Sequence, residues 1–307
     1  MTKVFIDGSA GTTGLRIVDR LSQRQDLQLL TLPEELRKDA AARKEALFAA
    51  DVAFLCLPDD AAREAVALAE GSKVKIIDTS TAHRTNDAWA YGFPELAGKR
   101  SQIQASNRIA NPGCHASGFI ALVAPLVEQG IVDRAAKLSC FSLTGYSGGG
   151  KKMIAQYQDP QRDVLYDAPR QYALGQTHKH LPEMVKLCGL ENAPVFCPIV
   201  ADFYSGMEVT VSLFGSDIKG TADDIRQLYA SYYASGLVKA LDDSDPDGLL
   251  SAGGYSGRDD MQVSVAGNQD RIILTARFDN LCNGASGAAI QNMNILLGLD
   301  EATGLNV

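Results

Sequence analysis

The sequence predicts two domains of different construction: a doubly wound α/β domain with a parallel sheet, then an α+β domain whose sheet is mainly antiparallel. Strand-like and helix-like runs alternate strictly over about the first 80 residues, and longer strand runs without regular helical crossovers follow from about residue 135. The chain has 307 residues and is 46% hydrophobic, which is enough to fill two cores of this size.

The alternating pattern begins with a strand, KVFIDG, which leads through glycines into a helix with Leu15, Val18 and Leu21 on one face. Further strands are predicted at 26–32, 51–58 and 73–80, with helices at 35–50 and 60–71. Because a strand, a helix and a second parallel strand connect with one hand, this order predicts a parallel sheet with helices on both faces. We assign residues 1–114 to this domain.

The second domain is predicted to cover residues 115–283. Its strands are expected within 136–150, 193–215 and 261–280, with a helix at 221–235. A last helix, about 284–300, carries Ala288, Ile290 and Met293, which would lack cover if the helix stood alone. We therefore expect this helix to pack back onto the first domain.

Composition and charge exclude several classes of function. The net charge is −8 with no basic block, so the chain has no electrostatic footprint for nucleic acid. The N-terminus runs directly into a strand, and neither a signal peptide nor a membrane span is expected. The six cysteines have no paired spacing, which argues against a disulfide framework or a zinc site and favours the cytoplasm. Small molecules are the expected partners.

The loop GSAGTTG, residues 8–14, lies between the first strand and the first helix. In this setting glycines let the backbone approach a pyrophosphate, which the helix N-terminus attracts. We predict a dinucleotide site of the Rossmann type here; the alternative is a tight turn that binds nothing. The residues assigned to the site are those of the loop: Gly8, Ser9, Ala10, Gly11, Thr12, Thr13 and Gly14.

The residues after the second strand leave the choice of cofactor open. Glu34 and Glu35 could hold a ribose hydroxyl, which favours NAD. Arg37 and Lys38 could instead hold the 2′-phosphate of NADP.

A second glycine-rich run, GYSGGGKK at 145–152, nearly matches the phosphate loop of ATPases. Lys152 occupies the place of the magnesium-binding hydroxyl, and the run lies outside the parallel domain, so a nucleoside triphosphatase is not expected. Backbone amides and two lysines could still bind a phosphate group without a metal. A glycine turn without a ligand is the alternative.

Cys114, in the segment NPGCHASG, immediately precedes an apolar run that is expected to be helical. A helix N-terminus would increase the thiolate character of this residue, and a neighbouring imidazole would add to the effect.

Two of the four histidines, His178 and His180, fall together in GQTHKHLPE. Pro182 disfavours a helix there, and an extended segment would put both rings on one face. Glu183 is the one obvious further metal ligand nearby, so we favour acid–base work over a metal site. Together with the glycine loop and Cys114, these histidines indicate hydride transfer to or from an enzyme-bound thioester.

Six segments carry a resemblance to a known family: IIDTSTAHR (76–84), YGFPEL (91–96), NPGC (111–114), TGYSGGGKK (144–152), HKHLPE (178–183) and DNLCNGASGAAIQNMN (279–294). The chain resembles the N-acetyl-gamma-glutamyl-phosphate reductases of arginine biosynthesis, in their shorter form. The resemblance spans almost the whole chain, and NPGC with the later H-x-H-x-P-E is far more specific than the glycine loop. The related aspartate-semialdehyde dehydrogenases share the two-domain architecture and the cysteine chemistry.

The resemblance implies that NADPH reduces N-acetyl-L-glutamyl 5-phosphate to N-acetyl-L-glutamate 5-semialdehyde and phosphate, in a homodimer or homotetramer built through the second domain's sheet. It implies that Cys114 is the nucleophile and that His180 or His178, beside Glu183, is the acid–base group. Further cofactor contacts are expected from Ser80, Gly284, Ala285 and Ser286. The candidates for binding the substrate's carboxylate and phosphate are Arg84, Arg108, Ser147, Gly148 and Lys151.

Two alternatives stay open. One is the same chemistry on another acyl phosphate, such as aspartyl phosphate or a carrier-bound aminoadipyl phosphate. The other is a dinucleotide-sensing protein with no chemistry. The chain also departs from the family at Cys282 and Asn283, where Gly-Lys is common, so no lysine contact is expected from that position.

Overall fold

The computed structural model describes residues 1–241 and 244–307, and it divides the chain into two compact units. Unit 1 comprises Met1–Pro112 and Ala285–Leu305, and unit 2 comprises Gly113–Gly284 and Asn306–Val307. The segment that contains the cysteine of NPGC therefore begins unit 2.

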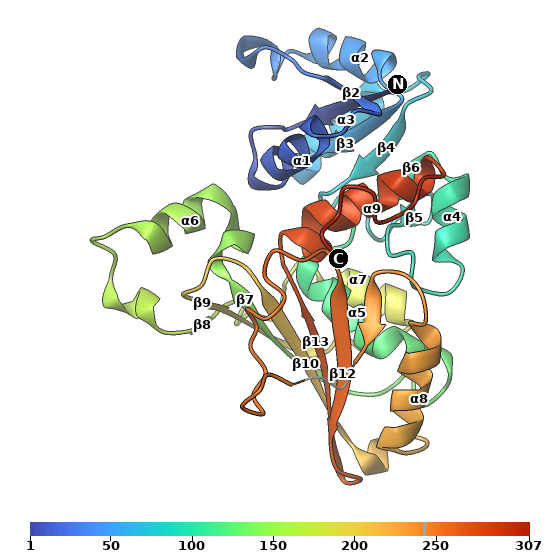
Figure 1. Ribbon diagram of the computed structural model, residues 1–307, viewed down its shortest axis with the longest axis vertical. Coiled ribbons are helices and arrows are strands. Elements are labelled where there is room, and N and C mark those ends of the chain that lie inside the picture. Colours follow the sequence, from blue (N-terminus) through green and yellow to red (C-terminus); the bar gives the residue numbers. More distant parts are fainter. Residues whose placement is uncertain (242–243) are drawn as a thin grey trace. The chain divides into compact units, whose positions relative to one another are not determined.

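Unit 1 is built on a parallel sheet that, in the described residues, has six strands in the order β2-β1-β3-β4-β6-β5 (Figure 1). The strands are β1 (Thr2–Asp7), β2 (Leu27–Leu30), β3 (Val52–Leu55), β4 (Lys75–Asp78), β5 (Ala90–Tyr91) and β6 (Arg108–Ala110). The strand order changes direction between β1 and β3, and such a switch point leaves a crevice at the carboxyl ends of the strands. The predicted doubly wound domain is confirmed.

Helices cover both faces of this sheet. Neighbouring residues of each strand point to opposite sides, so both faces carry apolar side chains that must be buried. Their bounds are α1 (Thr12–Ser22), α2 (Ala40–Ala49), α3 (Asp59–Leu68), α4 (Lys99–Ala105) and α9 (Gly287–Leu296). Val4 and Ile6 pack in one core with α1, α4 and α9, to which α9 contributes Ile290 and Met293. Phe5 packs in the opposite core with α2 and α3.

The helix expected at 35–50 is shorter than predicted. A 3-10 turn, Glu34–Leu36, comes first, and α2 begins only at Ala40. The carboxylate of Asp39 accepts a hydrogen bond of 2.8 Å from the backbone N–H of Ala42 and so caps the helix. A capping residue inside the predicted range therefore set the boundary.

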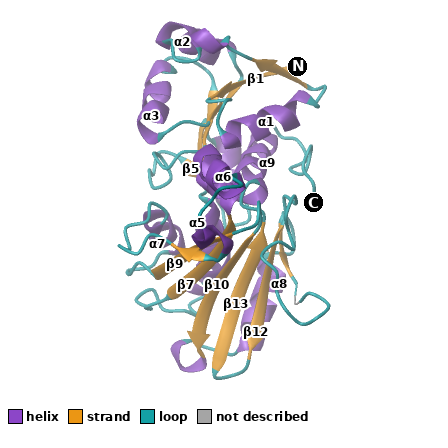
Figure 2. Cartoon of the chain, turned by 90° about the vertical axis from the view of Figure 1, so that its left-hand side faces the viewer, coloured by secondary structure: helices purple, strands orange, loops and turns teal. Residues whose placement is uncertain are grey.

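Unit 2 contains a mixed sheet that, in the described residues, has seven strands in the order β11-β12-β13-β10-β7-β9-β8. The strands are β7 (Ser139–Gly145), β8 (Arg170–Gln171), β9 (Val195–Ala201), β10 (Met207–Phe214), β11 (Val238–Ala240), β12 (Met261–Gly267) and β13 (Arg271–Phe278). Figure 2 shows β7, β10, β13 and β12 side by side. The pairs β11·β12 and β7·β9 are parallel and the other neighbours are antiparallel, which confirms a mainly antiparallel sheet.

The helices of unit 2 are α5 (Cys114–Glu128), α6 (Gly150–Gln158), α7 (Leu181–Cys188) and α8 (Ala222–Tyr232). The long apolar helix α5 lies close against the sheet at Gly118, where a Cβ atom would stand 2.5 Å from the side chain of Val209. The hydroxyl of Tyr233, just after α8, donates a hydrogen bond of 2.6 Å to the carbonyl of Ala121. Helix α5 is therefore held by the sheet and by the residue that follows α8. No helix in the described part of the chain is long and apolar enough to cross a membrane.

One local prediction for unit 2 is wrong. Pro182 does not prevent a helix, because it stands in the first turn of α7, where its missing N–H has no helical partner to lose. The N–H of Leu181 donates to the carbonyl of His178 at 3.0 Å, so this segment is a turn and not an extended strand. The glycine run at 145–152 forms a 3-10 turn, Tyr146–Gly149, and the start of α6, directly after β7.

Candidate active site

The glycine loop of unit 1 follows β1 directly at the switch point of the sheet. Gly8 has a φ of +86°, and a Cβ atom there would lie 2.3 Å from the carbonyl oxygen of Cys56, just beyond β3. A Cβ atom at Gly14 would lie 2.4 Å from the carbonyl oxygen of Gly8. At Gly11 the nearest atom would be 3.5 Å away, which is ordinary contact. Gly8 and Gly14 therefore close the turn, while Gly11 keeps an exposed backbone uncovered, and this arrangement fits the pyrophosphate of a dinucleotide at the start of α1.

Asp7, the last residue of β1, was not singled out by sequence. It is buried, and Arg43 of α2 donates to its carboxylate from Nε at 3.0 Å. Burial raises the pKa of Asp7, and the positive charge of Arg43 opposes this rise. Arg43 also pairs with the exposed Glu64 at 3.0 Å, so the base of the glycine loop is held by a buried Asp7–Arg43 pair that a surface carboxylate extends.

The four residues proposed to choose between NAD and NADP lie in and directly after the 3-10 turn that precedes α2. All of them are exposed: Glu34, Glu35, Arg37 and Lys38. Both charges are therefore accessible on the segment that follows β2.

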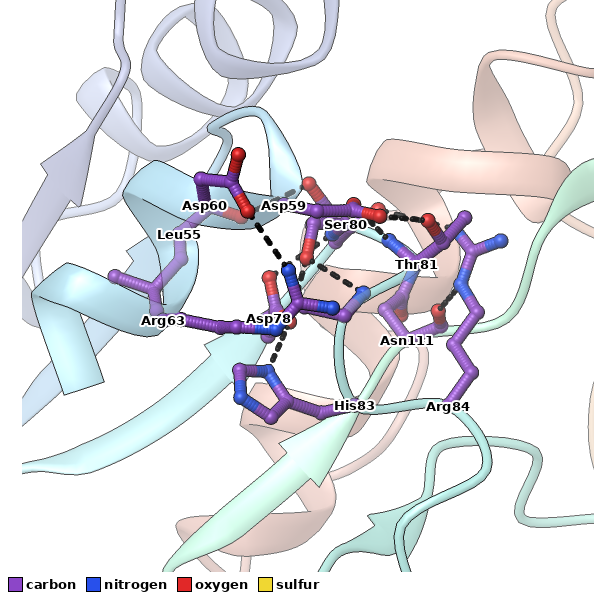
Figure 3. Close-up of polar contacts among 12 residues, drawn as sticks. Leu55, Asp59, Asp60, Arg63, Asp78, Ser80, Thr81, His83, Arg84 and Asn111 are labelled. Atoms are coloured by element: carbon purple, nitrogen blue, oxygen red, sulfur yellow. Dashed lines mark hydrogen bonds and ion pairs between the residues drawn. The ribbon is translucent and has the colours of Figure 1, made fainter. Parts of the chain in front are cut away.

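Ser80 and Arg84 lie in a polar network at the carboxyl end of β4 (Figure 3). Asp78 is fully buried and accepts hydrogen bonds from the backbone N–H and the hydroxyl of Ser80, at 2.9 and 2.8 Å. It also lies 2.6 Å from Nδ1 of His83. Arg84 donates to the carbonyl oxygens of Asn111 at 2.9 Å and of Thr79 at 3.0 Å. The guanidinium therefore joins the end of β4 to the turn that leads to Cys114, a role that the substrate assignment did not anticipate.

Arg108 does not lie with these residues. It begins β6, and its guanidinium donates to the carbonyl of Val74, just before β4, at 2.9 Å. Since β4 and β6 are parallel, this contact is at the amino edge of the sheet, opposite the glycine loop. Arg108 therefore lies at the other edge of the sheet from Ser80 and Arg84, and its assignment to substrate binding stays a prediction.

Ala285 and Ser286 belong to unit 1 and lie at the start of α9. The carbonyl oxygen of Ala285 accepts a hydrogen bond of 3.0 Å from the side-chain amide of Asn111. Ser286 is fully buried. This turn is therefore attached to the same segment that Arg84 holds.

Cys114 is the first residue of α5, with Gly113 as its N-cap, and its side chain is half-buried. The N–H of Gly113 donates to the Glu183 carboxylate at 3.2 Å, which connects the start of α5 with α7. A Cβ atom at Gly284 would lie 2.8 Å from the Cβ of Cys114. The family resemblance assigned a cofactor contact to Gly284. In the structure its backbone lies close to Cys114 within unit 2.

Three histidine rings gather beside the start of α5. His178 and His180 have ring centroids 4.6 Å apart, and His115 lies 5.6 Å from each of them. His180 Nε2 is 4.0 Å from the carboxylate of Glu183. The turn at 178–181 and the helix α7 therefore bring both predicted histidines and Glu183 to one place. In the described residues no group of three or more His, Cys, Asp or Glu side chains has an arrangement that could hold a metal ion.

Sequence reasoning missed His115 and the two residues that bind it. Its Nδ1 lies 2.6 Å from the hydroxyl of Ser142 on β7, and its Nε2 lies 2.7 Å from the hydroxyl of Tyr172. Burial, with a smaller contribution from His178, lowers the pKa of His115 to about 3, so the ring is neutral. The place of His115 directly after Cys114 was a usable signal, whereas nothing local marked Ser142 or Tyr172.

The remaining predicted residues lie around the start of α6 and the turn before α9. Ser147 is buried, and its hydroxyl accepts a hydrogen bond of 3.0 Å from the side chain of Asn280. Gly148 and Lys151 are exposed. Asn283, at the departure from the family pattern, donates to the carbonyl of Asp259 at 2.9 Å. That position therefore makes an internal contact in this chain.

Two family models match the chain. Residues 3–105 match the NAD binding domain of semialdehyde dehydrogenase, and residues 114–280 match its dimerisation domain. The fold is similar to that of aspartate semialdehyde dehydrogenase II from Vibrio cholerae, with a TM-score of 0.73 and 16% identity over 97% of this chain and 99% of that one. It is also similar to the Candida albicans aspartate semialdehyde dehydrogenase with NADP, with a TM-score of 0.67 and 17% identity over 97% and 99%. At such identities the likeness concerns the fold alone.

Curated relatives cover nearly the full length. N-acetyl-gamma-glutamyl-phosphate reductase 2 of Nostoc sp. strain PCC 7120 is 45% identical over 99% of this chain and 99% of its own. The N-acetyl-gamma-glutamyl-phosphate reductase of Brucella ovis is 44% identical over 96% and 99%. The resemblance seen in the sequence is thereby confirmed: this chain belongs to the N-acetyl-gamma-glutamyl-phosphate reductase family.

Proposed function

We propose that this protein reduces N-acetyl-L-glutamyl 5-phosphate to N-acetyl-L-glutamate 5-semialdehyde with NADPH, in the biosynthesis of arginine. The observation that carries the proposal is the position of Cys114: a half-buried thiol at the N-terminus of a 15-residue helix, in a family whose relatives are named for this reaction. The N-terminus of α5 favours negative charge, which suits a thiolate nucleophile.

In the proposed reaction the sulfur of Cys114 attacks the acyl carbon, and the bond from that carbon to the phosphate oxygen breaks. Phosphate leaves and a thioester remains on Cys114. A bulky anionic acyl phosphate is thereby replaced by a planar, neutral carbonyl. A bound cofactor would supply hydride to the thioester carbon, and the oxygen would take a proton from His180. The same proton would return to His180 as the thiohemiacetal collapses, which releases the aldehyde and restores the thiolate.

We assign the acid–base role at the thiohemiacetal oxygen to His180. Its ring lies 4.0 Å from the Glu183 carboxylate, which can orient the imidazole and stabilise its charged form. Because Glu183 also accepts the N–H of Gly113, the same carboxylate fixes the turn before Cys114. We assign substrate placement to His178, and contacts with the substrate phosphate to Ser147, Gly148 and Lys151.

The glycine loop, residues 8–14, would hold the pyrophosphate of the cofactor, and Arg37 with Lys38 would hold the 2′-phosphate that distinguishes NADP from NAD. Bound there, NADPH supplies the hydride. The buried pair of Asp7 and Arg43 keeps the base of this loop rigid, which favours a preformed cradle.

A steady-state assay in the reverse direction tests the substrate. Phosphate-dependent reduction of NADP⁺ is measured with N-acetylglutamate semialdehyde and with aspartate semialdehyde. We expect kcat/KM to favour the first substrate by at least about 100-fold, or about 3 kcal/mol. A preference for aspartate semialdehyde would assign the enzyme to the other acyl phosphate.

Thiol labelling at neutral pH tests the non-catalytic alternative. We expect Cys114 to react first among the six cysteines, because burial raises the pKa of Cys56, Cys140 and Cys188. An inert Cys114 would favour a protein that senses dinucleotides without chemistry.

A homodimer or homotetramer built through the second sheet accords with the family description of residues 114–280 as a dimerisation domain. The pairing registers put Phe141, Val195, Phe214 and Ile273 on one face of the sheet, and each of these side chains is at least 42% exposed. Exposed apolar side chains on one face of a sheet are typical of an interface. Light scattering is expected to give two or four times the mass of one chain, and Phe141→Glu is expected to lower it.

A cytoplasmic location is the last part of the proposal. None of the six cysteines, all of which lie in the described residues, takes part in a disulfide, which suits a reducing compartment. Fractionation of cells that carry a tagged protein tests this expectation.

A further inference from the structure

A chain of three polar side chains from three separate elements leads to the neighbourhood of Cys114. Ser142 on β7 contacts Nδ1 of His115 on α5 at 2.6 Å, and Nε2 of His115 contacts the hydroxyl of Tyr172, just after β8, at 2.7 Å. Ser142 has no exposed surface, and His115 is 4% exposed. Ser142 and His115 are therefore cut off from solvent.

The neutral state of His115 limits how protons are arranged along this chain. Burial lowers the pKa of the ring to about 3, so near neutral pH one nitrogen donates a hydrogen bond and the other accepts one. Either Ser142 donates to Nδ1 and Nε2–H donates to Tyr172, or both hydrogen bonds run the other way.

Ser142 decides the direction. Among the residues that the structure describes, His115 is the one side-chain partner of its hydroxyl. If His115 donated to Ser142, the serine's own buried O–H would have no acceptor, at a cost of about 1–3 kcal/mol. Ser142 therefore donates to Nδ1, the proton of His115 is on Nε2, and Nε2–H donates to the oxygen of Tyr172.

This direction leaves the proton of Tyr172 available. The phenol oxygen accepts from His115, and within residues 1–241 and 244–307 no second partner of the hydroxyl is present. Burial raises the pKa of Tyr172, and negative charge on Cys114 raises it further, so the phenol keeps its proton at neutral pH. Its hydroxyl lies 2.7 Å from Nε2 of His115, the residue that directly follows Cys114. A neutral O–H donor thus lies near the nucleophile.

We propose that Tyr172 donates a hydrogen bond to the acyl oxygen as it becomes negatively charged on the carbon bound to Cys114, and that Ser142 and His115 are positioning residues that aim its hydroxyl. The inference rests on the proposed function, since it needs an acyl group on Cys114. No proton is transferred along the chain. Tyr172 stabilises the oxyanion, whereas His180 handles the proton.

Tyr172→Phe tests the donor, because it removes the hydroxyl and keeps the ring. We expect kcat to fall about 100-fold in phosphate-dependent NADP⁺ reduction, the loss typical of one oxyanion-hole donor. The rate of Cys114 alkylation is expected to stay as in the wild type, because it needs no donor to an acyl oxygen. The melting temperature is expected to fall by a few degrees only, because the buried Nε2–H of His115 loses its acceptor at a cost of about 1–3 kcal/mol. Tyr204→Phe, at an exposed tyrosine, is the matched control.

Ser142→Ala tests the positioning. It is expected to lower kcat about tenfold in the wild-type background and to have no further effect in Tyr172→Phe, since a misdirected chain matters only when the hydroxyl is present. If Ser142→Ala lowers kcat by the same factor in both backgrounds, the positioning role is overturned, because that result indicates a structural role for Ser142.

Nitrogen NMR of ¹⁵N-histidine protein gives a readout that does not depend on turnover. We expect His115 to carry its proton on Nε2, and Ser142→Ala to shift that proton toward Nδ1. If His115 of the wild-type protein carries its proton on Nδ1, Ser142 and His115 do not position the Tyr172 hydroxyl as proposed. A Tyr172→Phe enzyme within threefold of wild type would overturn the oxyanion role and leave the proposed function intact. A wild-type protein that does not turn over any semialdehyde would overturn both.

Discussion

The glycine loop of unit 1 and the Cys114 cluster of unit 2 are built on opposite principles. The loop is one continuous stretch, and it depends on missing side chains: a Cβ atom at Gly8 would lie 2.3 Å from a carbonyl oxygen. The cluster depends on side chains that are far apart in the sequence, such as Cys114, Tyr172 and His180, and it is held by contacts between α5, α7 and the sheet. Substitutions are therefore expected to damage the loop by adding atoms and the cluster by removing functional groups.

The largest expected effect is that of Cys114→Ser. A serine hydroxyl has no comparable anionic fraction near pH 7, so turnover is expected to be lost almost completely while NADPH binding, followed by fluorescence, persists. Cys56→Ser is the matched control, because burial raises the pKa of that thiol to about 12 and makes it unreactive near neutral pH. More than about a tenth of the wild-type rate in Cys114→Ser would contradict the assignment of the nucleophile.

The two histidines of the cluster come next. His180→Asn is expected to lower kcat by about 100-fold, within the usual range for acid–base catalysis, because the ring near Glu183 carries the proton. His178→Asn is expected to act mainly on KM. Steady-state kinetics of both variants test this difference. If His178→Asn has the larger effect on kcat, His178 is the acid–base group. If both variants lose thermal stability while kcat changes little, both histidines have structural roles.

Gly8→Ala and Gly11→Ala compare two positions within the loop. Gly8→Ala is expected to cost about 2–3 kcal/mol of unfolding free energy, because its φ of +86° and the carbonyl of Cys56 both oppose a side chain. Gly11→Ala has room for its methyl group and is expected to keep its stability but lose cofactor affinity, because it covers the exposed backbone. Chemical denaturation and NADPH titration measure the two quantities. Equal losses of stability would mean that Gly11 is also a turn residue.

The smallest expected effect concerns the choice of cofactor. Replacing Arg37 and Lys38 together by glutamine is expected to lower kcat/KM for NADPH about tenfold, or about 1.4 kcal/mol, with little change for NADH. Both side chains are exposed, so folding is not expected to change. An equal fall with both cofactors would contradict the contact with the 2′-phosphate. A wild-type enzyme that uses NADH as well as NADPH would instead assign the ribose contact to Glu34 or Glu35.

The fold class and the glycine loop could be predicted from the sequence because short, local sequence patterns determine them. Alternating strands and helices set the parallel sheet of unit 1, and the spacing of Gly8, Gly11 and Gly14 marked a turn that only a glycine-rich chain can make. The start of α2 was misplaced because the capping bond of Asp39 competes with helix propensity inside the predicted range. At Pro182 the rule that disfavours helix before proline was applied where the first turn of a helix tolerates it.

Residue types alone pointed to Cys114, His178, His180 and Glu183, because few side chains can perform this chemistry and they occur in short, specific segments. Long-range pairing was needed for the rest. Arg108 appeared suitable by charge, but parallel pairing of β4 and β6 puts it at the amino edge of the sheet. Ser142 and Tyr172 meet His115 only because α5 packs on the sheet that carries β7 and β8, and the direction of their hydrogen bonds depends on a burial that no local pattern encodes.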